Sequence, residues 1–480
     1  MAEKLILVTG STGYIASHLI PRLLDLGYRV RCLARTPHRL HARAWSRYVD
    51  VVTGDVTIPS TLPAALEGVH TAYYLIHNMA AGRGYPARET DGAQNFLQAA
   101  EQAGVQHIIY LGGLADENTP SRHMRSRLQT GEILRQGHIP VTEFRASVIV
   151  GPGSISFEMI RYMTELMPII FGPPWLQNLA QPIAIQNVID YLTAVLETPK
   201  LGGQVYEIGG PDILSYAEAM LAYGHLRGLR RKYVVVPGIP LWLMALGVEW
   251  VTPVPAIIAR PLVGGMRGAS VVRQPHAQRV FPHIRLISYE DAVREALTHL
   301  HPHRITPGWE QNLRPSSILK QEGFFLDHRS LPVAAPPEQV FAALCSMGGR
   351  NGWPYANRLW QLRGWLDRLL TRPERSMNEV EVPQQLKTGD TLDSYRVEAL
   401  EANRRLLLRA ELKAPGDGWM EWKVQPHEGG SLLTQTAFFA PHGLPGFLYW
   451  YGLWPLHTLV FRGLLRALAR QSEKKQAASI

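Results

Sequence analysis

The sequence predicts a doubly wound parallel α/β domain followed by a smaller α+β domain. In the first 150 residues, short apolar runs alternate with segments whose apolar residues recur at helical spacing, which is typical of βαβ units and a parallel sheet. The first apolar run passes directly into a glycine-containing turn. After about residue 319 the apolar runs follow one another with few helical segments between them, which indicates antiparallel strands.

Each element of the first domain has a local signal. Leu5–Thr9 is a short apolar run, and Tyr14–Leu26 repeats apolar residues every three or four positions. The same two patterns predict strands at 30–34, 49–53, 71–76, 107–111 and 140–150 and helices at 89–103 and 126–136. We therefore expect a parallel sheet with helices on both faces.

The patterns divide the chain into two domains. Residues 1–302 form the predicted α/β domain, in which helices and short strands mix over about 151–302 to make an accessory lobe. Residues 303–318 include Pro307, Gly308 and Pro315 and have no clear period, so we expect a linker there. Residues 319–480 form the predicted α+β domain.

The composition narrows the class of protein. Of the 480 residues, 46% are hydrophobic and 19% charged, a balance that supports a packed core. The formal charge of +9 is modest for this length, and no dense basic cluster indicates a nucleic-acid partner. Cys32 and Cys345 are the only two cysteines, which excludes a disulfide framework and favours a cytoplasmic location.

Two apolar stretches bear on membrane contact. Pro237–Ala259 carries Glu249 and four prolines, and Phe438–Phe461 contains two histidines and three prolines. A spanning helix needs about 20 mostly apolar residues in succession. We therefore expect no transmembrane span, while peripheral contact with a membrane stays open as an alternative.

The strongest motif is the turn from Val8 to Ala16. Gly10 permits a tight strand-to-helix turn, Gly13 lets backbone amides approach a pyrophosphate, and Ala16 is small enough for close packing of helix and strand. The helix that follows directs its positive end at the phosphates. The turn therefore predicts a dinucleotide site, and its predicted cofactor contacts are Gly10, Ser11, Thr12, Gly13, Tyr14 and Ile15.

The end of the second strand predicts which dinucleotide binds. NAD-binding versions place a carboxylate there to hold the ribose 2′-hydroxyl group, whereas this strand ends in Ala34-Arg35. Arg35 can pair with a 2′-phosphate, Arg39 is a second candidate, and Thr12 can add a hydroxyl group. We therefore expect NADP(H) in preference to NAD(H).

The turn and the later strand ends together resemble the atypical and extended short-chain dehydrogenase/reductases, especially the NmrA-like group, over about residues 1–300. The resemblance rests on Gly54-Asp55-Val56, on Tyr73–His77, on Tyr110–Gly113 and on Phe144–Gly153. It implies a Rossmann-like fold with the substrate lobe at about 151–302. It also implies that Asp55 contacts the adenine amine beside Val56, and that Leu75, Ile76 and His77 lie along the cofactor.

The catalytic positions depart from the family pattern. Active members use a Tyr-x-x-x-Lys pair and a serine near the end of the fifth strand. Here His123 stands at the tyrosine position, Arg127 at the lysine position, and a glycine, Gly112 or Gly113, at the serine position. Histidine can transfer protons near neutral pH, so we expect His123 as the proton donor and Arg127 on the cofactor ribose.

The second domain resembles an uncharacterised domain found fused to such reductases, and through it the START/polyketide-cyclase helix-grip folds. The resemblance rests on motifs such as Pro337–Phe341, Gly352-Trp353 and Gly443–Trp450. It implies a curved antiparallel sheet around a long C-terminal helix, enclosing an apolar cavity for a hydrophobic small molecule. The alternative is that the many aromatic side chains simply form the core.

Three functional hypotheses follow. The first is an NADP(H)-dependent oxidoreductase that acts on an apolar carbonyl- or quinone-like substrate, and the second is a non-catalytic NADP(H)-binding redox sensor or scaffold. The third is a protein that binds a hydrophobic ligand such as a lipid. We expect no metal site, because Pro302 and the linker setting make His299, His301 and His303 a poor ligand set.

Overall fold

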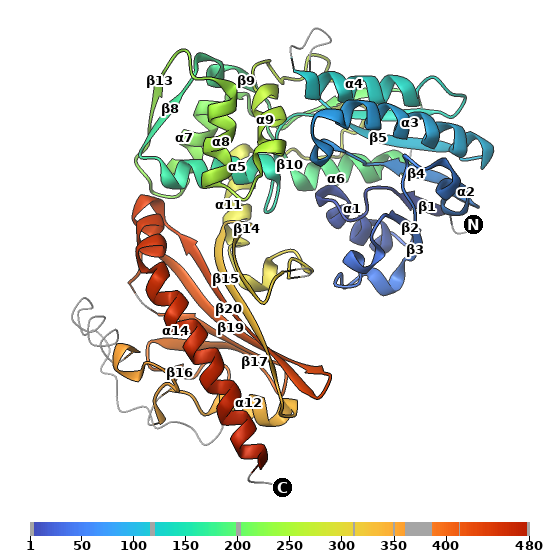
Figure 1. The fold of residues 1–480 in the computed structure, drawn as a ribbon. Coiled ribbons are helices and arrows are strands. Elements are labelled where there is room, and N and C mark those ends of the chain that lie inside the picture. Colours follow the sequence, from blue (N-terminus) through green and yellow to red (C-terminus); the bar gives the residue numbers. More distant parts are fainter. Residues whose placement is uncertain are drawn as a thin grey trace. The chain divides into compact units, whose positions relative to one another are not determined.

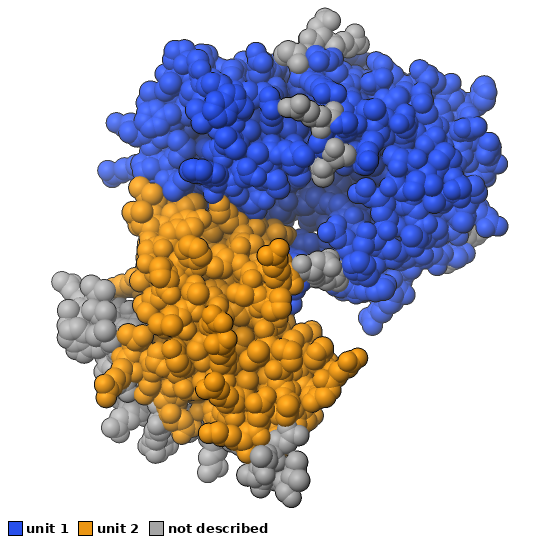
Figure 2. Space-filling view, in the orientation of Figure 1, with its two compact units in different colours: residues 1–311 blue, residues 312–480 orange. Residues whose placement is uncertain are grey.

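The computed structural model describes residues 4–115, 121–197, 203–310, 313–348, 351–360, 386–411 and 413–477. The chain divides into two compact units, residues 1–311 and 312–480 (Figure 2). This boundary falls inside the expected linker, although a strand of the second unit, β14 (Ser316–Gln321), begins before that linker ends.

The first unit is built on a seven-stranded parallel sheet in the order β11-β6-β5-β4-β1-β2-β3 (Figure 1). The strands are β1 (Leu5–Val8), β2 (Arg29–Ala34), β3 (Asp50–Thr53), β4 (Thr71–Tyr74), β5 (His107–Gly113), β6 (Val141–Ala146) and β11 (Val205–Ile208). This arrangement confirms the predicted Rossmann-like sheet. Because all strands run the same way, the carboxyl ends of β1, β2, β4 and β5 meet at one edge.

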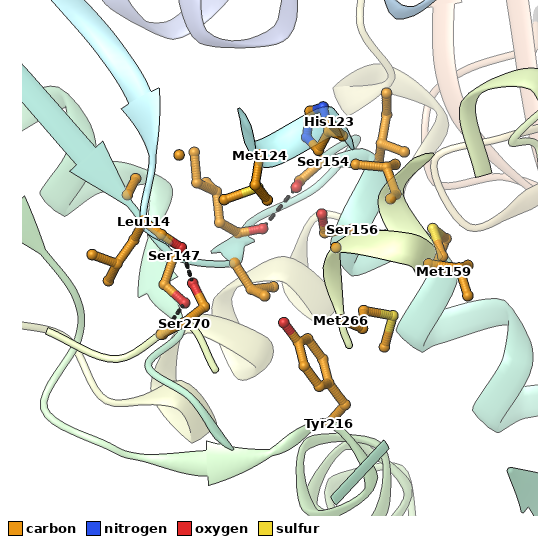
Figure 3. Close-up of a pocket in the computed structure, with 18 of the residues that line it drawn as sticks. Leu114, His123, Met124, Ser147, Ser154, Ser156, Met159, Tyr216, Met266 and Ser270 are labelled. Atoms are coloured by element: carbon orange, nitrogen blue, oxygen red, sulfur yellow. Dashed lines mark hydrogen bonds between the residues drawn. The ribbon is translucent and has the colours of Figure 1, made fainter. Parts of the chain in front are cut away.

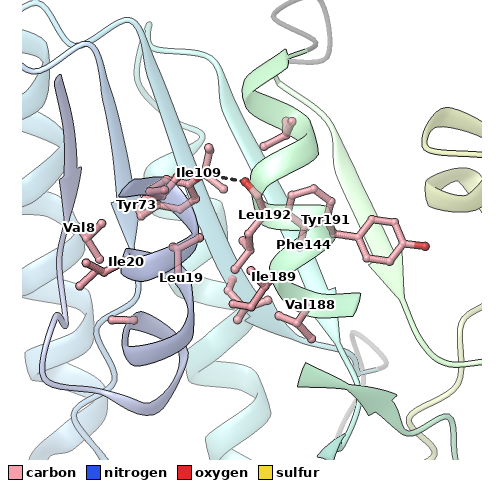
Figure 4. Close-up of a cluster of buried hydrophobic side chains, with 14 of the residues drawn as sticks. Val8, Leu19, Ile20, Tyr73, Ile109, Phe144, Val188, Ile189, Tyr191 and Leu192 are labelled. Atoms are coloured by element: carbon pink, nitrogen blue, oxygen red, sulfur yellow. Dashed lines mark hydrogen bonds between the residues drawn. The ribbon is translucent and has the colours of Figure 1, made fainter. Parts of the chain in front are cut away.

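Helices cover both faces of this sheet because its strands are apolar on both sides. In β5, Ile108 and Tyr110 face one buried cluster while Ile109 and Leu111 face the other. The first cluster includes α2 (Leu62–Leu66), α3 (Tyr85–Gln102) and α4 (Arg122–Leu134). The second includes α1 (Tyr14–Asp25) and α6 (Ile185–Ala194), and Figure 4 shows Leu19, Ile20 and Leu192 from these helices packed beside Tyr73.

The accessory lobe contains helices and three two-stranded ladders. The ladders pair β7 (Ile149–Val150) with β10 (Ile183–Ala184), β8 (Ile169–Gly172) with β13 (Lys232–Val235), and β9 (Leu179–Ala180) with β12 (Leu214–Ser215). The helices include α5 (Ile155–Leu166), α7 (Tyr216–Leu226), α8 (Leu241–Val251), α9 (Ala256–Gly265) and α11 (Tyr289–Thr298). The last of these helices, α11, has Ser288 as its N-cap, because Ser288 Oγ accepts a hydrogen bond from Asp291 N.

The second unit is an antiparallel sheet with the order β14-β15-β20-β19-β18-β17-β16. Its strands after β14 are β15 (Phe324–Val333), β16 (Thr391–Leu392), β17 (Tyr395–Glu401), β18 (Arg405–Ala410), β19 (Gly416–His427) and β20 (Gly430–Pro441), and its helices include α12 (Pro337–Cys345) and α14 (Gly443–Ala477). The long helix α14, red in Figure 1, packs on β15 and β20.

The aromatic side chains of this unit fill its core. Trp422 is fully buried and donates a hydrogen bond from Nε1 to Gln435 Oε1 at 3.1 Å. Trp353 stacks on Trp360 with ring centroids 4.5 Å apart. From α14, side chains between Val460 and Ala469 join the same cluster. These contacts support the interpretation of the aromatics as core residues.

Neither of the two apolar stretches forms a membrane-crossing helix. The stretch 237–259 folds into α8 and the start of α9, which Pro253 and Pro255 separate. Within the described part of the chain, no helix is both long enough and apolar enough to span a bilayer.

Candidate active site

The glycine turn lies at the carboxyl end of β1 and is fixed by backbone geometry. Gly10 has φ +63°, and a Cβ atom there would lie 2.8 Å from the carbonyl oxygen of Leu75. Gly13 N donates a hydrogen bond to Gly10 O at 2.8 Å, and α1 starts at the next residue without a side-chain cap. The turn therefore leaves open the space beside the positive end of α1, where a dinucleotide phosphate would bind.

The side chains of the turn have different surroundings. Ser11 is buried and donates from Oγ to Leu33 O at 2.9 Å, so its hydroxyl group ties the turn to β2. Thr12 is exposed. Tyr14 and Ile15 line an apolar pocket together with Leu75, which directly follows β4. The C-terminal residues of the turn, Tyr14 and Ile15, thus border a cavity.

Arg35 and Asp55 lie beside the adenosine end of the expected cofactor site. The Arg35 side chain is 66% exposed, and its Nη1 atom is 3.9 Å from Asp55 Oδ2. Asp55 Oδ1 accepts hydrogen bonds from the backbone N and the Oγ1 of Thr57, both at 2.9 Å. A guanidinium this exposed, at the end of β2, can turn toward a 2′-phosphate.

Two of the predicted contact residues are placed mainly by packing. Val56 is buried in the cluster under α2 and α3, and its carbonyl oxygen accepts a hydrogen bond from Asn95 Nδ2 at 3.0 Å. Ile76 packs against the same cluster. Its carbonyl oxygen accepts a hydrogen bond from Arg127 Nη1 at 3.4 Å. The side chain of Val56 therefore contributes to the core rather than to the cavity lining.

Arg127, on α4, bridges the ends of two strands. Its Nη1 atom bonds to Ile76 O after β4, and its Nη2 atom donates to Leu111 O in β5. The guanidinium carbon lies 5.0 Å from the centre of the Tyr110 ring. The side chain also lines the pocket. Arg127 is therefore a fixed positive charge at the position where the resemblance predicts a ribose contact.

His123 and His77 form a stacked pair at the same pocket, in which His123 is buried and His77 is partly buried. Their rings stack with centroids 4.9 Å apart and an interplanar angle of 29°. His123 Nδ1 and His77 Nε2 are buried and have no hydrogen-bond partner among the described residues. Burial, reinforced by the neighbouring His77 and Arg127, lowers the pKa of His123 to about 3. This environment favours the neutral form of His123, and its role as proton donor stays a prediction.

Glu89, on α3, completes this cluster. It is 3% exposed, accepts a hydrogen bond from His77 Nδ1 at 2.5 Å, and accepts another from Ser126 Oγ. Burial by itself would raise the pKa of Glu89, but the hydrogen bonds from His77 and Ser126 and the charge of Arg127 lower it to about 2. An ionised carboxylate only accepts hydrogen bonds, so the proton of neutral His77 is on Nδ1 and its Nε2 lone pair is free.

Sequence reasoning missed Glu89, although its position in α3 carried a signal. Tyr85, Glu89, Gly92 and Phe96 recur at helical spacing, and all four are buried. A carboxylate on the apolar side of a helix needs a partner inside the fold. The sequence alone does not say that this partner is a histidine from the end of β4.

The pocket itself is a cavity of about 380 Å³ within the first unit. Seven methionines line it: Met79, Met124, Met159, Met163, Met220, Met244 and Met266. Flexible thioether side chains suit irregular apolar ligands. Figure 3 shows Tyr216 directing its hydroxyl group into the pocket, with Met266 beside it. Burial raises the pKa of Tyr216 to about 12, so it stays a hydrogen-bond donor. The sequence analysis did not single out Tyr216.

The described residues offer no ligand set for a metal ion. Across the described ranges, no group of three or more His, Cys, Asp or Glu side chains is placed to hold one. His301 and His303 stack on each other with ring centroids 4.8 Å apart, in a short turn near the end of the first unit.

Comparisons with known families agree with this site. Residues 10–147 match the NAD(P)H-binding family model, and residues 321–464 match a protein family of unknown function, DUF2867. The chain therefore carries an NAD(P)-binding Rossmann domain of the short-chain dehydrogenase/reductase type, followed by a DUF2867 domain. The first of these matches contains the glycine turn, Arg35, the histidine pair and Arg127.

Individual relatives cover about half of the chain. A ceramide reductase from Caulobacter vibrioides is 25% identical over 238 residues, which are 49% of this chain and 74% of that protein. The photosystem II assembly factor Ycf39 of Trieres chinensis is 24% identical over 246 residues, 50% of this chain and 74% of that protein. A triphenylmethane reductase structure from Citrobacter sp. shares the fold, with a TM-score of 0.51, 19% identity and coverage of 61% of this chain and 99% of that one.

Proposed function

We propose that the protein is an NADP(H)-dependent oxidoreductase acting on an apolar carbonyl- or quinone-like substrate. One observation carries the proposal. Tyr14, Leu75 and Arg127 border the same cavity as the methionines and the histidine pair. The cofactor-binding edge of the sheet thus opens into an apolar chamber that holds a few polar groups, which is typical of a small-molecule site. The relative named a ceramide reductase supports an apolar substrate.

The residues present fit a nicotinamide dinucleotide. Exposed Gly13 and the N-terminus of α1, which has no side-chain cap, leave backbone amides available to a phosphate, and exposed Arg35 is available for a 2′-phosphate. Arg127 is fixed at the strand ends, where it would hold the nicotinamide ribose. When bound, the cofactor would supply or accept a hydride.

The protein's own groups supply hydrogen bonds and a proton acceptor. His77 Nε2 carries a lone pair at the pocket, and Glu89 stabilises the imidazolium that forms when this nitrogen accepts a proton from a substrate hydroxyl group. In the reverse direction the protonated ring returns that proton to the substrate oxygen. Neutral His123, stacked on His77, and Tyr216 can hydrogen-bond the substrate within the same cavity.

A second candidate function is a non-catalytic NADP(H) sensor or scaffold. Two observations support it: the serine position is glycine, and burial lowers the pKa of both His123 and His77, which disfavours their protonated forms. The relative named a photosystem II assembly factor also supports it. A third candidate, a carrier of a hydrophobic ligand, is supported by the methionine-lined cavity. Organic extraction of the purified protein would reveal a copurifying lipid.

For residues 319–480 we propose a helix-grip fold that binds a hydrophobic small molecule. The antiparallel order of the seven strands and the packing of α14 on β15 and β20 support the fold. Because the aromatic core is densely packed, we propose that this ligand binds at the margin of the sheet and not at its centre.

The testing experiment has two stages on the full chain. Calorimetric titration with NADPH and NADH measures binding, and a panel of apolar aldehydes, ketones and quinones then measures NADPH oxidation. Binding with turnover supports the oxidoreductase. Tight NADPH binding without turnover across the panel supports the sensor, and no binding of either nucleotide contradicts both.

A further inference from the structure

An exposed apolar surface covers the outside of α8 and the start of α9. Its members are Trp242, Leu243, Leu246, Trp250 and Ile257, and we call it the α8–α9 surface. Trp250 is 81% exposed, although tryptophan is usually largely buried. Only Ala245 and Val248 of α8 are buried. A helix that is apolar on all sides normally has a cover on its outer face.

The inner faces of the same two helices line the substrate cavity. Met244 and Val248 of α8 and Leu262 and Val263 of α9 border it. The helices α8 and α9 therefore form a single layer between an apolar outer surface and an apolar chamber. A hydrophobic compound at the outer surface is separated from the cavity by this layer.

Cationic side chains gather beside this surface. A second pocket, of about 690 Å³, is lined by Arg122 at the start of α4 and by Arg260 and Arg267, together with the apolar Leu241 and Ile257. All three arginines are exposed, and no ion pair to them occurs among the described residues. Described residues contribute no carboxylate to the lining of this pocket. Guanidinium groups in such a setting bind phosphate oxygens.

We propose that the α8–α9 surface docks on a bilayer containing anionic phospholipids. The tryptophans and leucines enter the interface, while Arg122, Arg260 and Arg267 bind lipid phosphate groups. An apolar substrate dissolved in the bilayer then reaches the cavity without crossing water. The proposal of docking depends only on the α8–α9 surface and the arginines beside it, whereas the delivery of substrate rests on the proposed function.

Charge and residue type favour a membrane over a second protein copy. Tryptophan is enriched at membrane–water interfaces, and arginines near anionic headgroups add attraction. The carboxylate in α8, Glu249, is outnumbered by the three pocket arginines, and the chain as a whole carries +9. In a symmetric dimer formed through this surface, the arginines of one copy would lie near those of the other copy. Their like charges would then repel each other.

The experiment is flotation of the full chain with vesicles. Vesicles of phosphatidylcholine alone are compared with vesicles of equal parts phosphatidylcholine and phosphatidylglycerol, at low and high salt. We expect the protein to float with the anionic vesicles and high salt to weaken this. Trp242→Gln with Trp250→Gln should reduce the bound fraction at least about tenfold, and each of Arg260→Gln and Arg267→Gln should reduce the affinity about fivefold. The matched control, Arg47→Gln with Tyr48→Gln in the exposed segment before β3, should bind like the unchanged protein.

Two results would overturn the proposal. One is the absence of binding to anionic vesicles by the unchanged protein. The other is a dimer, seen by light scattering, that the tryptophan substitutions dissociate, because this would assign the surface to a second copy. NADPH binding and oxidation with a water-soluble quinone are measured in parallel. A tryptophan variant that no longer floats but keeps its turnover would separate docking from the proposed function. If the unchanged protein floats but shows no turnover, docking is supported and the proposed function is not.

Discussion

Glu89 Oε1 accepts a hydrogen bond from His77 Nδ1 at 2.5 Å, and this contact determines which nitrogen of His77 is available at the pocket. The carboxylate comes from the second turn of α3 and the imidazole from the segment that follows β4. Since the ionised carboxylate requires a proton on Nδ1, the lone pair of His77 is on Nε2. In the proposed reaction the pair would act as an oriented base next to His123.

Replacing Glu89 by glutamine should slow turnover without weakening the cofactor. The amide keeps the shape but removes the charge that stabilises protonated His77, so we expect the hydride-transfer rate to fall about 10²-fold. Calorimetry should give an unchanged affinity for NADPH. Glu132→Gln, on the exposed side of α4, is the control. A variant whose rate matches that of the control would remove the proton-transfer role of the pair.

The Arg35→Asp substitution should separate the two dinucleotides. Loss of a charge-assisted contact to the 2′-phosphate should weaken NADPH binding at least about tenfold. NADH binding should stay equal or improve, because the new carboxylate can accept from a ribose hydroxyl group. Titration of Arg39→Asp with NADPH tests the second candidate arginine in the same way. Equal losses for NADPH and NADH in Arg35→Asp would contradict the predicted preference.

Gly10→Ala should damage both the fold and the cofactor site. The φ of +63° and the contact with Leu75 O at 2.8 Å both oppose a Cβ atom, so we expect a loss of about 2 kcal/mol or more in the free energy of unfolding. Gly27→Ala is a matched control, because Gly27 has φ +79° but a Cβ atom there would meet nothing within 4 Å. Urea denaturation and NADPH titration of both variants separate backbone strain from the clash.

The pH dependence of reduction should show no titration of His123 near neutrality. Its pKa is lowered to about 3, so its charge does not change between pH 6 and 8. If the imidazolium form of His123 were the proton donor, the rate would fall about tenfold per pH unit across this range. Single-turnover kinetics, with saturating NADPH and an apolar quinone, measure this slope. Protonated His77, the proposed donor in this direction, also has a pKa lowered by burial, so we expect the unchanged protein and His123→Gln to show the same slope. Loss of the slope in His123→Gln would instead assign the donor to His123.

Acid should destabilise the first unit through the protonation of Glu89 and His123. Folding lowers the pKa of Glu89 from 4.5 to about 2, so its stabilising effect is complete above about pH 4.5 and is lost as the pH falls toward 2. His123 has its pKa lowered from 6.5 to about 3, so the unfolded chain takes up its proton first and stability declines below pH 6.5. Urea unfolding at pH 7.5, 6 and 5 should show a shallower decline for His123→Gln. If the free energy of unfolding of His123→Gln fell with pH as steeply as that of the unchanged protein, the buried, neutral state of His123 would be contradicted.

Removing the Tyr216 hydroxyl group should affect the substrate and spare the cofactor. Tyr216→Phe keeps the ring in place but removes a buried donor from the methionine-lined cavity. We expect KM for an apolar ketone to rise about fivefold, corresponding to about 1 kcal/mol. Tyr206→Phe, in the core on β11, is the control. An unchanged KM would place the substrate oxygen elsewhere in the cavity.

The sequence predicted the elements whose signals are local. Residues in β1, β2, β4 and β5 formed apolar runs because strands buried on both faces are apolar throughout. In the second unit the local signals are weaker. The central residues of β15, Asp327 and Arg329, form a buried ion pair that interrupts the apolar run. The long helix α14 has Pro445 in its first turn and Pro455 inside it, and prolines normally discourage a continuous helix.

By itself the sequence determined the parallel sheet, the glycine turn and the arginine at the end of β2, since periodicity and backbone freedom are properties of neighbouring residues. Only the tertiary structure decided what His123 can do. Its low pKa follows from burial beside His77 and Arg127, and the tautomer of the stacked His77 is fixed by Glu89, which folding brings from another helix. Burial and contacts between distant segments set protonation, and no local pattern encodes them.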